Sequence, residues 1–156
     1  MSSVMHERVT IAPMKNSTSI KTDAAPPPVG AYPHARRCGN LLFLSGIGPR
    51  PADGGPIPGV KLDDSGHVVS HDIEAQCHAV FANVRTVLES AGATWNDLVD
   101  VTVYLTDIDS DFKKYNEIYA TYFSPDGPTR TTVEVNKLPT PIAIELKCIA
   151  AIIGTA

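Results

Sequence analysis

An arginine and a glutamate on two neighbouring strand-like segments are the side chains of this sequence best suited to chemistry. Arg130 opens the polar segment that ends at Val135, and Glu145 interrupts the apolar run Ile142 to Leu146. A guanidinium binds a carboxylate through two parallel hydrogen bonds. A glutamate on an apolar strand is costly to bury unless it is paired or used. This pattern predicts a pocket for a small carboxylic acid, with Glu145 placed to transfer protons.

The elements that position these two residues follow from hydrophobic periodicity. We predict short strands at Leu41–Ser45 and Leu98–Thr106, a long loop at Gly48–Gly66, and helices at Asp72–Ala91 and Asp109–Phe123. The first helix is expected to start at the N-cap Ser70 and stop at Gly92; the second would be capped by Asp109 or Ser110. With a further strand near Thr18 to Lys21, the order predicts a single α+β domain.

Strand alternation predicts which way the candidate residues point. Arg130 and Thr132 share one face of their strand, while Ile144 and Leu146 turn Glu145 away from the core. Two helices can cover only one face of the sheet. The other face would carry Thr102, Tyr104, Thr132, Ala143 and Ile149. Because that set is too apolar for water, we expect another subunit to cover it, with Arg130 and Glu145 at or near the interface.

Composition narrows the possible functions. The 156 residues carry a net charge of -4, with 43% hydrophobic and 19% charged residues, which is typical of one soluble domain. An acidic chain without a basic run is a poor ligand for nucleic acid or an anionic membrane. No apolar run approaches the roughly 20 residues of a membrane span. We expect residues 1–18 to be a poorly ordered extension and residues 19–156 to form the domain.

The three cysteines, Cys38, Cys77 and Cys148, are dispersed and odd in number, which argues against a disulfide framework or a zinc site. A reducing, cytoplasmic compartment is expected. His67, His71 and His78 lack the carboxylate or thiolate that would complete a plausible metal site, so no metal is predicted.

Several motifs, in order and spacing, resemble those of the Rid family, the reactive intermediate (enamine/imine) deaminases also called YjgF-like proteins. They are Gly30-Ala31-Tyr32, Gly39 to Gly46, Gln76 to Leu88, Val101 to Asp107, Tyr115-Asn116, Pro128 to Val135, Leu138-Pro139 and Ile144-Glu145. The resemblance implies a chorismate-mutase-like fold, with a mixed sheet and two helices on one face. It also implies a homotrimeric barrel with active sites between subunits.

Within that family the closest likeness is to members that deaminate 2-aminomuconate. It is carried by the insertion Gly48 to Val60 and by the segments Asp72 to Cys77 and Thr140 to Lys147. The implied reaction is hydrolysis of this enamine dicarboxylate, through its imine, to the 2-oxo dicarboxylate 4-oxalocrotonate and ammonia. Hydrolysis needs no electron sink, so no cofactor is expected. The alternatives are a broad-specificity 2-iminoacid or enamine deaminase, and a non-catalytic ligand-binding or regulatory protein.

The hypothesis assigns Arg130 to the substrate carboxylate and Glu145 to the attacking water and the leaving amine. Tyr32 would wall the pocket, and Ser45, Gly46, Thr132 and Asn116 would supply polar contacts. Arg50 is the first candidate for the second carboxylate, with His34 and Arg36 behind it. Two departures from the family affect specificity: Thr132 stands where many members have cysteine, and Ala31 where many have proline.

The alternative roles are structural. Arg130 would be a surface ion-pair partner, and Glu145 an interface residue paired with Lys147 or an arginine.

Overall fold

A six-stranded mixed sheet forms the body of the protein in the computed structural model, which describes residues 16–153. Its strands run in the order β1-β2-β3-β8-β6-β7, and all neighbours are antiparallel except the parallel pair β6 and β7. Their bounds are β1 Ser17–Ile20, β2 Ala35–Cys38, β3 Leu41–Leu44, β6 Leu98–Leu105, β7 Thr129–Glu134 and β8 Ile144–Ala151. The predicted early strand near Thr18 is therefore present as β1, and residues 1–15 lie outside the described part.

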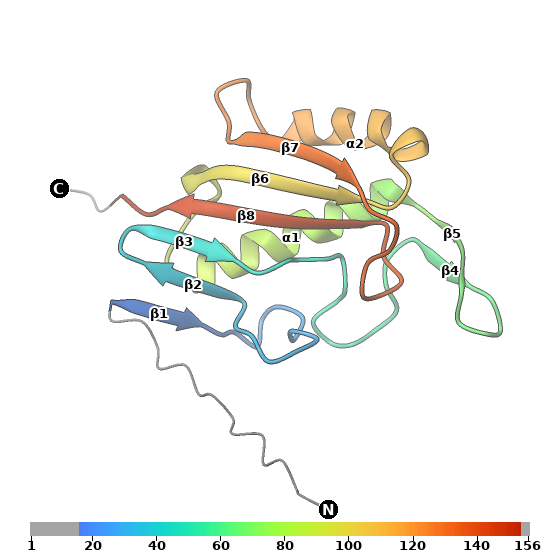
Figure 1. Ribbon diagram of the computed structural model, residues 1–156, viewed down its shortest axis with the longest axis horizontal. Helices are drawn as coiled ribbons and strands as arrows, with labels where there is room; N and C mark the ends of the chain where they lie inside the picture. The colour runs from blue at the N-terminus through green and yellow to red at the C-terminus, as the bar shows by residue number, and fades with distance from the viewer. Residues whose placement is uncertain (1–15, 154–156) are drawn as a thin grey trace, which may run out of the picture.

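Two helices, α1 (Ile73–Ser90) and α2 (Ile108–Tyr122), cover the same face of this sheet (Figure 1). Between them and the sheet lies one apolar core, whose largest members include Phe81, Leu88, Leu105, Tyr115 and Ile144. The predicted α+β class, with two helices on one face of a mixed sheet, is confirmed. No helix within residues 16–153 has the length and apolar character needed to cross a bilayer.

The helix boundaries differ slightly from the prediction because other side chains cap them. The carboxylate of Asp72, not Ser70, accepts hydrogen bonds from the backbone amides of Glu74 (2.9 Å) and Ala75 (3.2 Å) at the start of α1. The carboxylate of Asp107 caps α2 in place of Asp109 or Ser110. An aspartate just before the first turn satisfies amides that have no partner inside the helix.

A small hairpin of β4 (Val60–Leu62) and β5 (Val68–His71) stands apart from the main sheet and occupies part of the expected long loop. The sequence did not predict this hairpin or β2, because each of these strands has only three or four residues, too few to show a repeat. A 3-10 turn, η1 (Trp95–Asp97), leads into β6.

The structure corrects two predictions about faces. Arg130 and Thr132 pair with Val101 and Val103, which are buried under the helices, so Thr132 lies on the helix side. Ala143 precedes β8 and is buried in the core.

The face opposite the helices has no helix over it within the described residues, as predicted (Figure 1). Thr102 and Tyr104 of β6 pair with Lys147 and Glu145 of β8 on this open face. The strand β3 is buried on one face only. Leu42 and Leu44 are in the core, and Leu41 and Phe43 face outward.

Candidate functional site

Glu145 lies at the beginning of β8, on the open face of the sheet, at the edge of a small cavity. The cavity has a volume of about 120 Å³ and is formed by the loop after β1, the segment after β3 and the segment before β8. Its lining residues are Val29, Tyr32, Gly46, Gly48, Arg50, Pro139, Thr140, Ile142 and Glu145. The structure thus brings together four predicted site residues, which are Tyr32, Gly46, Arg50 and Glu145.

Gly46 makes room for the Glu145 carboxylate. A Cβ atom at position 46 would overlap the Glu145 Oε1 atom and lie 2.9 Å from its Cδ atom. Contacts this close do not occur between real side chains, so a larger residue would displace the carboxylate. Gly46 therefore acts through its lack of a side chain.

Burial raises the pKa of the Glu145 carboxyl above its ordinary value, because a desolvated carboxylate is disfavoured. The positive charge of Arg50 opposes that shift but does not cancel it. A raised carboxyl pKa brings the group closer to the range in which a general base and acid can exchange protons efficiently. Lys147 does not pair with Glu145 in the chain; its ammonium donates to the backbone carbonyl of Leu44.

Arg50 comes from the segment after β3 and is fixed to the loop that follows β1. Its Nη2 atom donates to the carbonyl of Pro27 at 2.7 Å. The remaining guanidinium donors stay close enough to Glu145 to lower its pKa. Arg50 therefore places a positive charge beside Glu145; that it binds the second carboxylate of a substrate stays a prediction.

The hydroxyl group of Ser45 makes a hydrogen bond within the protein. Its Oγ atom donates to the carbonyl of Pro33 at 2.7 Å, which ties β3 to the loop carrying Tyr32. Ser45 and Gly46 also line a second small hollow beside Arg50 and His34. The predicted polar contact from Ser45 is thus made to the protein itself.

Arg130 lies elsewhere, on β7 at the edge of the sheet, and α2 holds its guanidinium. Nη2 donates to Oδ1 of Asn116 at 3.0 Å, and the guanidinium carbon lies 4.5 Å from the ring centre of Tyr119 and 5.5 Å from that of Tyr115. Stacking on two rings and one amide bond restrict the orientation of the fork. Arg130, Thr132, Ile108, Asp109 and Phe112 line an open hollow of about 450 Å³.

Three hydroxyl groups around Arg130 are buried and have no hydrogen-bond partner among the described residues: those of Tyr115, Tyr119 and Thr132. Burial also raises the pKa of Tyr115 and Tyr119, so both phenols stay neutral. Unsatisfied buried hydroxyls are uncommon and mark a place where water or a ligand would find donors and acceptors.

The predicted site therefore divides into two half-sites within one chain. Glu145 pairs with Tyr104 on the open face, whereas Arg130 pairs with Val101 on the helix face. The sheet separates the two side chains, so one chain does not bring Arg130 to Glu145. The sequence placed both residues at or near a subunit interface, and a pocket that they share between two subunits stays a prediction. Asn116 and Thr132 belong to the Arg130 half-site.

The sequence did not single out Tyr115 and Tyr119, the tyrosines that hold Arg130. Their spacing of four, with Asn116 between them, places all three toward one strand, which was the available signal. Arg36 and His34, the further candidates for the second carboxylate, bond to other groups of the protein. Arg36 donates to Ser17 at 3.0 Å, and both ring nitrogens of His34 bond to the backbone. Among residues 16–153, no group of three His, Cys, Asp or Glu side chains is arranged to hold a metal ion.

Comparisons with known proteins place this arrangement in a family. Residues 22–152 match the family model described as endoribonuclease L-PSP. A RutC family protein of Pyrococcus abyssi is 41% identical over 132 residues, covering 84% of this chain and 94% of that protein. Reactive Intermediate Deaminase A, chloroplastic, of Arabidopsis thaliana is 38% identical over 133 residues, covering 85% of this chain and 65% of that protein.

A solved structure agrees with the same assignment. The crystal structure of E. coli TdcF with bound serine superposes with a TM-score of 0.73 at 30% identity, covering 86% of this chain and 98% of TdcF. The chain belongs to the endoribonuclease L-PSP family, the Rid or RutC family that includes proteins named reactive intermediate deaminases.

Proposed function

We propose that this protein hydrolyses the imine tautomers of small 2-amino-enoic or 2-imino acids, releasing ammonia and a 2-oxo acid. The observation that carries the proposal is a half-buried Glu145 with a raised pKa at the edge of a cavity that Gly46 keeps open. The name of the Arabidopsis relative, Reactive Intermediate Deaminase A, supports the same reaction class.

The proposed reaction needs only water and proton transfers. The imine reacts in its protonated, iminium form. Glu145 takes a proton from water as the oxygen attacks the C=N carbon, and the C=N electron pair moves to nitrogen to give the amine of a carbinolamine. The same carboxyl then returns that proton to the nitrogen, the C–N bond breaks with ammonia leaving, and the hydroxyl proton passes to the Glu145 carboxylate as the carbonyl group forms. An arginine bound to the adjacent carboxylate holds the C=N carbon in place for attack.

A second copy of the chain would supply that arginine. In this proposal three copies form a ring in which the Arg130 half-site of one copy meets the Glu145 half-site of the next. Three features support it: a sheet face without a helix, outward-facing Leu41 and Phe43 on that face, and buried hydroxyls without partners beside Arg130. Symmetric rings of this kind repeat one heterologous contact.

The test mixes two inactive variants, Arg130→Ala and Glu145→Gln, unfolded together and refolded. Each variant alone is expected to lose at least about a hundredfold in kcat/KM for ammonia release from 2-iminopropanoate generated in the assay. In random hybrid rings about one site in four combines an intact Arg130 with an intact Glu145 from different copies, so activity returns to about a quarter of wild type. Failure of the mixture to regain activity refutes a shared site, and full activity of either variant refutes that residue's role.

A second candidate function follows from Arg50. We propose that a dicarboxylate such as 2-aminomuconate is the preferred substrate, with its distal carboxylate bound by Arg50, whose charge already acts on Glu145. Turnover of 2-aminomuconate and of 2-iminopropanoate would be compared for wild type and Arg50→Met. A loss of more than about tenfold confined to the dicarboxylate supports the narrower function, because one buried charge pair contributes about 1.5–3 kcal/mol. Equal losses on both substrates support the generalist, and no ammonia release from either substrate supports a binding protein without catalysis.

A further inference from the structure

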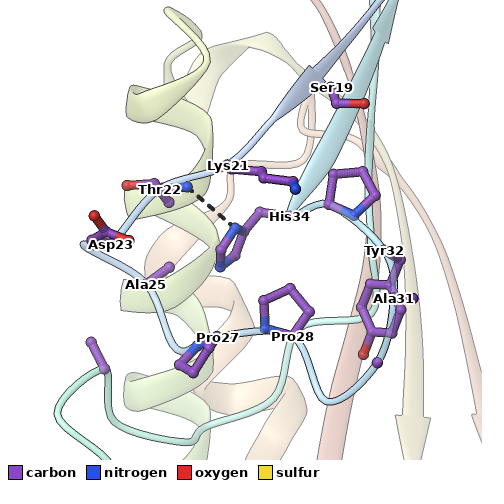
Figure 2. A pocket seen from close by; sticks show the side chains of 13 residues that line it. Ser19, Lys21, Thr22, Asp23, Ala25, Pro27, Pro28, Ala31, Tyr32 and His34 are labelled. Atoms are coloured by element: carbon purple, nitrogen blue, oxygen red, sulfur yellow. Dashed lines mark hydrogen bonds between the residues drawn. The ribbon is translucent and has the colours of Figure 1, made fainter. Parts of the chain in front are cut away.

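His34 lies at the base of the loop formed by residues 21–34, between β1 and β2. Its side chain is almost fully buried, with 9% of the residue exposed. Nδ1 accepts a hydrogen bond from the backbone amide of Thr22 at 3.3 Å, and Nε2 bonds to the carbonyl oxygen of Pro26 at 3.0 Å. Figure 2 shows the ring enclosed by this loop, with Thr22 above it and Pro28 below.

The two partners of His34 determine how its ring is protonated. A carbonyl oxygen can only accept a hydrogen bond, so Nε2 carries the hydrogen, and a backbone amide can only donate, so Nδ1 offers its lone pair. Both bonds exist together only in the neutral Nε2–H tautomer. Both ring nitrogens are therefore occupied. In this arrangement neither is free to bind the second carboxylate of a substrate, the ligand for which His34 was a candidate.

Two side chains that line the Glu145 cavity depend on the loop closed by His34: one belongs to the loop, and the other is bonded to it. Tyr32 belongs to the loop and lines the cavity, and Arg50 is anchored to it through the carbonyl of Pro27, next to the Pro26 carbonyl that His34 holds. Ser45 ties the end of the loop to β3 through Pro33. Because this loop contains no helix or strand of its own, side-chain bonds must fix its shape.

We propose that His34 is a positioning residue: it closes the loop from Thr22 to Pro26 and so fixes Tyr32 and Arg50 around a ligand that it never touches. The inference deepens the proposed function, on which its kinetic part rests. Loss of the His34 bonds would leave Glu145 in place while Tyr32 and the Arg50 anchor become free to move. The expected defect is therefore in binding and orientation of the substrate rather than in folding of the sheet.

Two substitutions, His34→Gln and His34→Asn, test whether the two hydrogen bonds of His34 are needed or whether any polar side chain is enough. In His34→Gln the side-chain oxygen can accept from Thr22 and the NH₂ group can donate to Pro26, as the imidazole does. His34→Asn carries the same group one methylene nearer the backbone, where it cannot reach both partners. The pair is matched in chemistry and charge, and differs only in reach.

The experiment measures amide hydrogen exchange of residues 22–33 and steady-state kinetics for wild type and both variants. In the wild type, the Thr22 amide is expected to be protected despite its place in a loop, because it donates to the ring. In His34→Asn, exchange across the loop accelerates at least about tenfold and KM rises at least about tenfold, whereas His34→Gln stays within about threefold of wild type for both.

An unprotected Thr22 amide in the wild type would by itself overturn the proposal. Equal exchange rates and equal KM values for His34→Gln and His34→Asn would also overturn it. Should His34→Asn fail to fold, the Thr22 amide and the His34→Gln variant still decide the question, because a Gln variant with a mobile loop contradicts the assignment. A wild-type protein without deaminase activity would refute the proposed function alone, since the exchange measurements test the loop independently of turnover.

Discussion

At the scale of single residues, the chemistry of this chain depends on how Glu145 is solvated. Burial raises the pKa of its carboxyl, and Arg50 moderates that rise. A carboxyl with a pKa higher in the folded than in the unfolded protein binds its proton more readily when folded. Its ionised form therefore lowers stability at pH values above the raised pKa, and that loss disappears as pH falls through it. In the proposed hydrolysis, the same shift would keep Glu145 available as both base and acid.

Replacing Arg50 by Met should move the acid limb of the activity profile to higher pH. The guanidinium lowers the pKa of Glu145, and its removal leaves the effect of burial unopposed. Since the base must be ionised, kcat/KM would then begin to fall at a higher pH on acidification. The measurement is kcat/KM against pH on a monocarboxylate substrate. Arg37→Met is the control, because it removes a partly exposed arginine on β2 whose Nε atom donates to the carbonyl of Gly39. Coincident acid limbs for Arg50→Met and wild type would contradict the assignment.

Adding one methyl group at Gly46 should strongly reduce turnover. In Gly46→Ala the new Cβ atom occupies the place of the Glu145 carboxylate, which must rotate away from the cavity. We expect kcat to fall about a hundredfold, the usual scale for misplacing a catalytic group, with a much smaller change in thermal unfolding. Gly55→Ala, in the loop after β3, serves as the control, and an unchanged kcat in Gly46→Ala would show that Glu145 does not act from this position.

At the scale of secondary-structure elements, α2 organises the Arg130 half-site. It presents Tyr115, Asn116 and Tyr119 toward β7, and together they hold the guanidinium from behind. The N-terminus of α2 is also tied to this strand, because the Ile108 amide donates to Glu134 at 2.8 Å. A pre-oriented guanidinium loses less freedom when it binds a carboxylate. In the proposed site, the helix would therefore contribute to binding as well as to the core.

Removing the ring of Tyr119 should weaken substrate binding, whereas removing only its hydroxyl should not. A cation stacked on an aromatic face contributes about 0.5–2 kcal/mol, so Tyr119→Leu is expected to raise KM by about twofold to thirtyfold. Tyr119→Phe keeps the ring over Arg130 and loses only a hydroxyl that has no hydrogen-bond partner among the described residues. Substrate titrations of both variants give the comparison. Similar KM values for Leu and Phe would mean that stacking does not position Arg130.

At the scale of the whole molecule, a single folded chain leaves one face of its sheet open and holds only half of the proposed site. Leu41 and Phe43 face outward from β3, and Glu145 lies on the same face at the start of β8. The apolar residues on this face would favour its burial in an assembly. Assembly and catalysis are then coupled, because each proposed site needs residues of two chains.

A charge at Phe43 should disrupt the assembly and activity together while leaving the fold intact. Phe43 is 36% exposed in the single chain, so Phe43→Glu is tolerated there but would bury an unpaired carboxylate between subunits. The expected result is a monomer in size-exclusion chromatography with light scattering, native circular dichroism, and activity at least about a hundredfold lower. The matched control is Val69→Glu, on the exposed hairpin strand β5. A fully active Phe43→Glu monomer would exclude the shared site.

Sequence alone determined the local parts of this protein. Periodicity predicted both helices to within one residue at each end, and alternation correctly turned Glu145 away from the core, because side-chain direction along one element follows from its repeat. The motif around Arg130 and Glu145 indicated the family. The strands β2, β4 and β5 were not predicted, since three or four residues are too few to show a repeat.

Only the tertiary structure decided how these parts face one another. Arg130 and Glu145 lie on opposite sides of the sheet because β7 pairs with β6 in a register that aligns Arg130 with the buried Val101, while β8 aligns Glu145 with Tyr104. Register between strands depends on pairing across many residues and cannot be obtained from alternation within one strand. The closure of the loop by His34 and the stacking of Tyr119 on Arg130 likewise join segments distant in the chain, which only folding brings into contact.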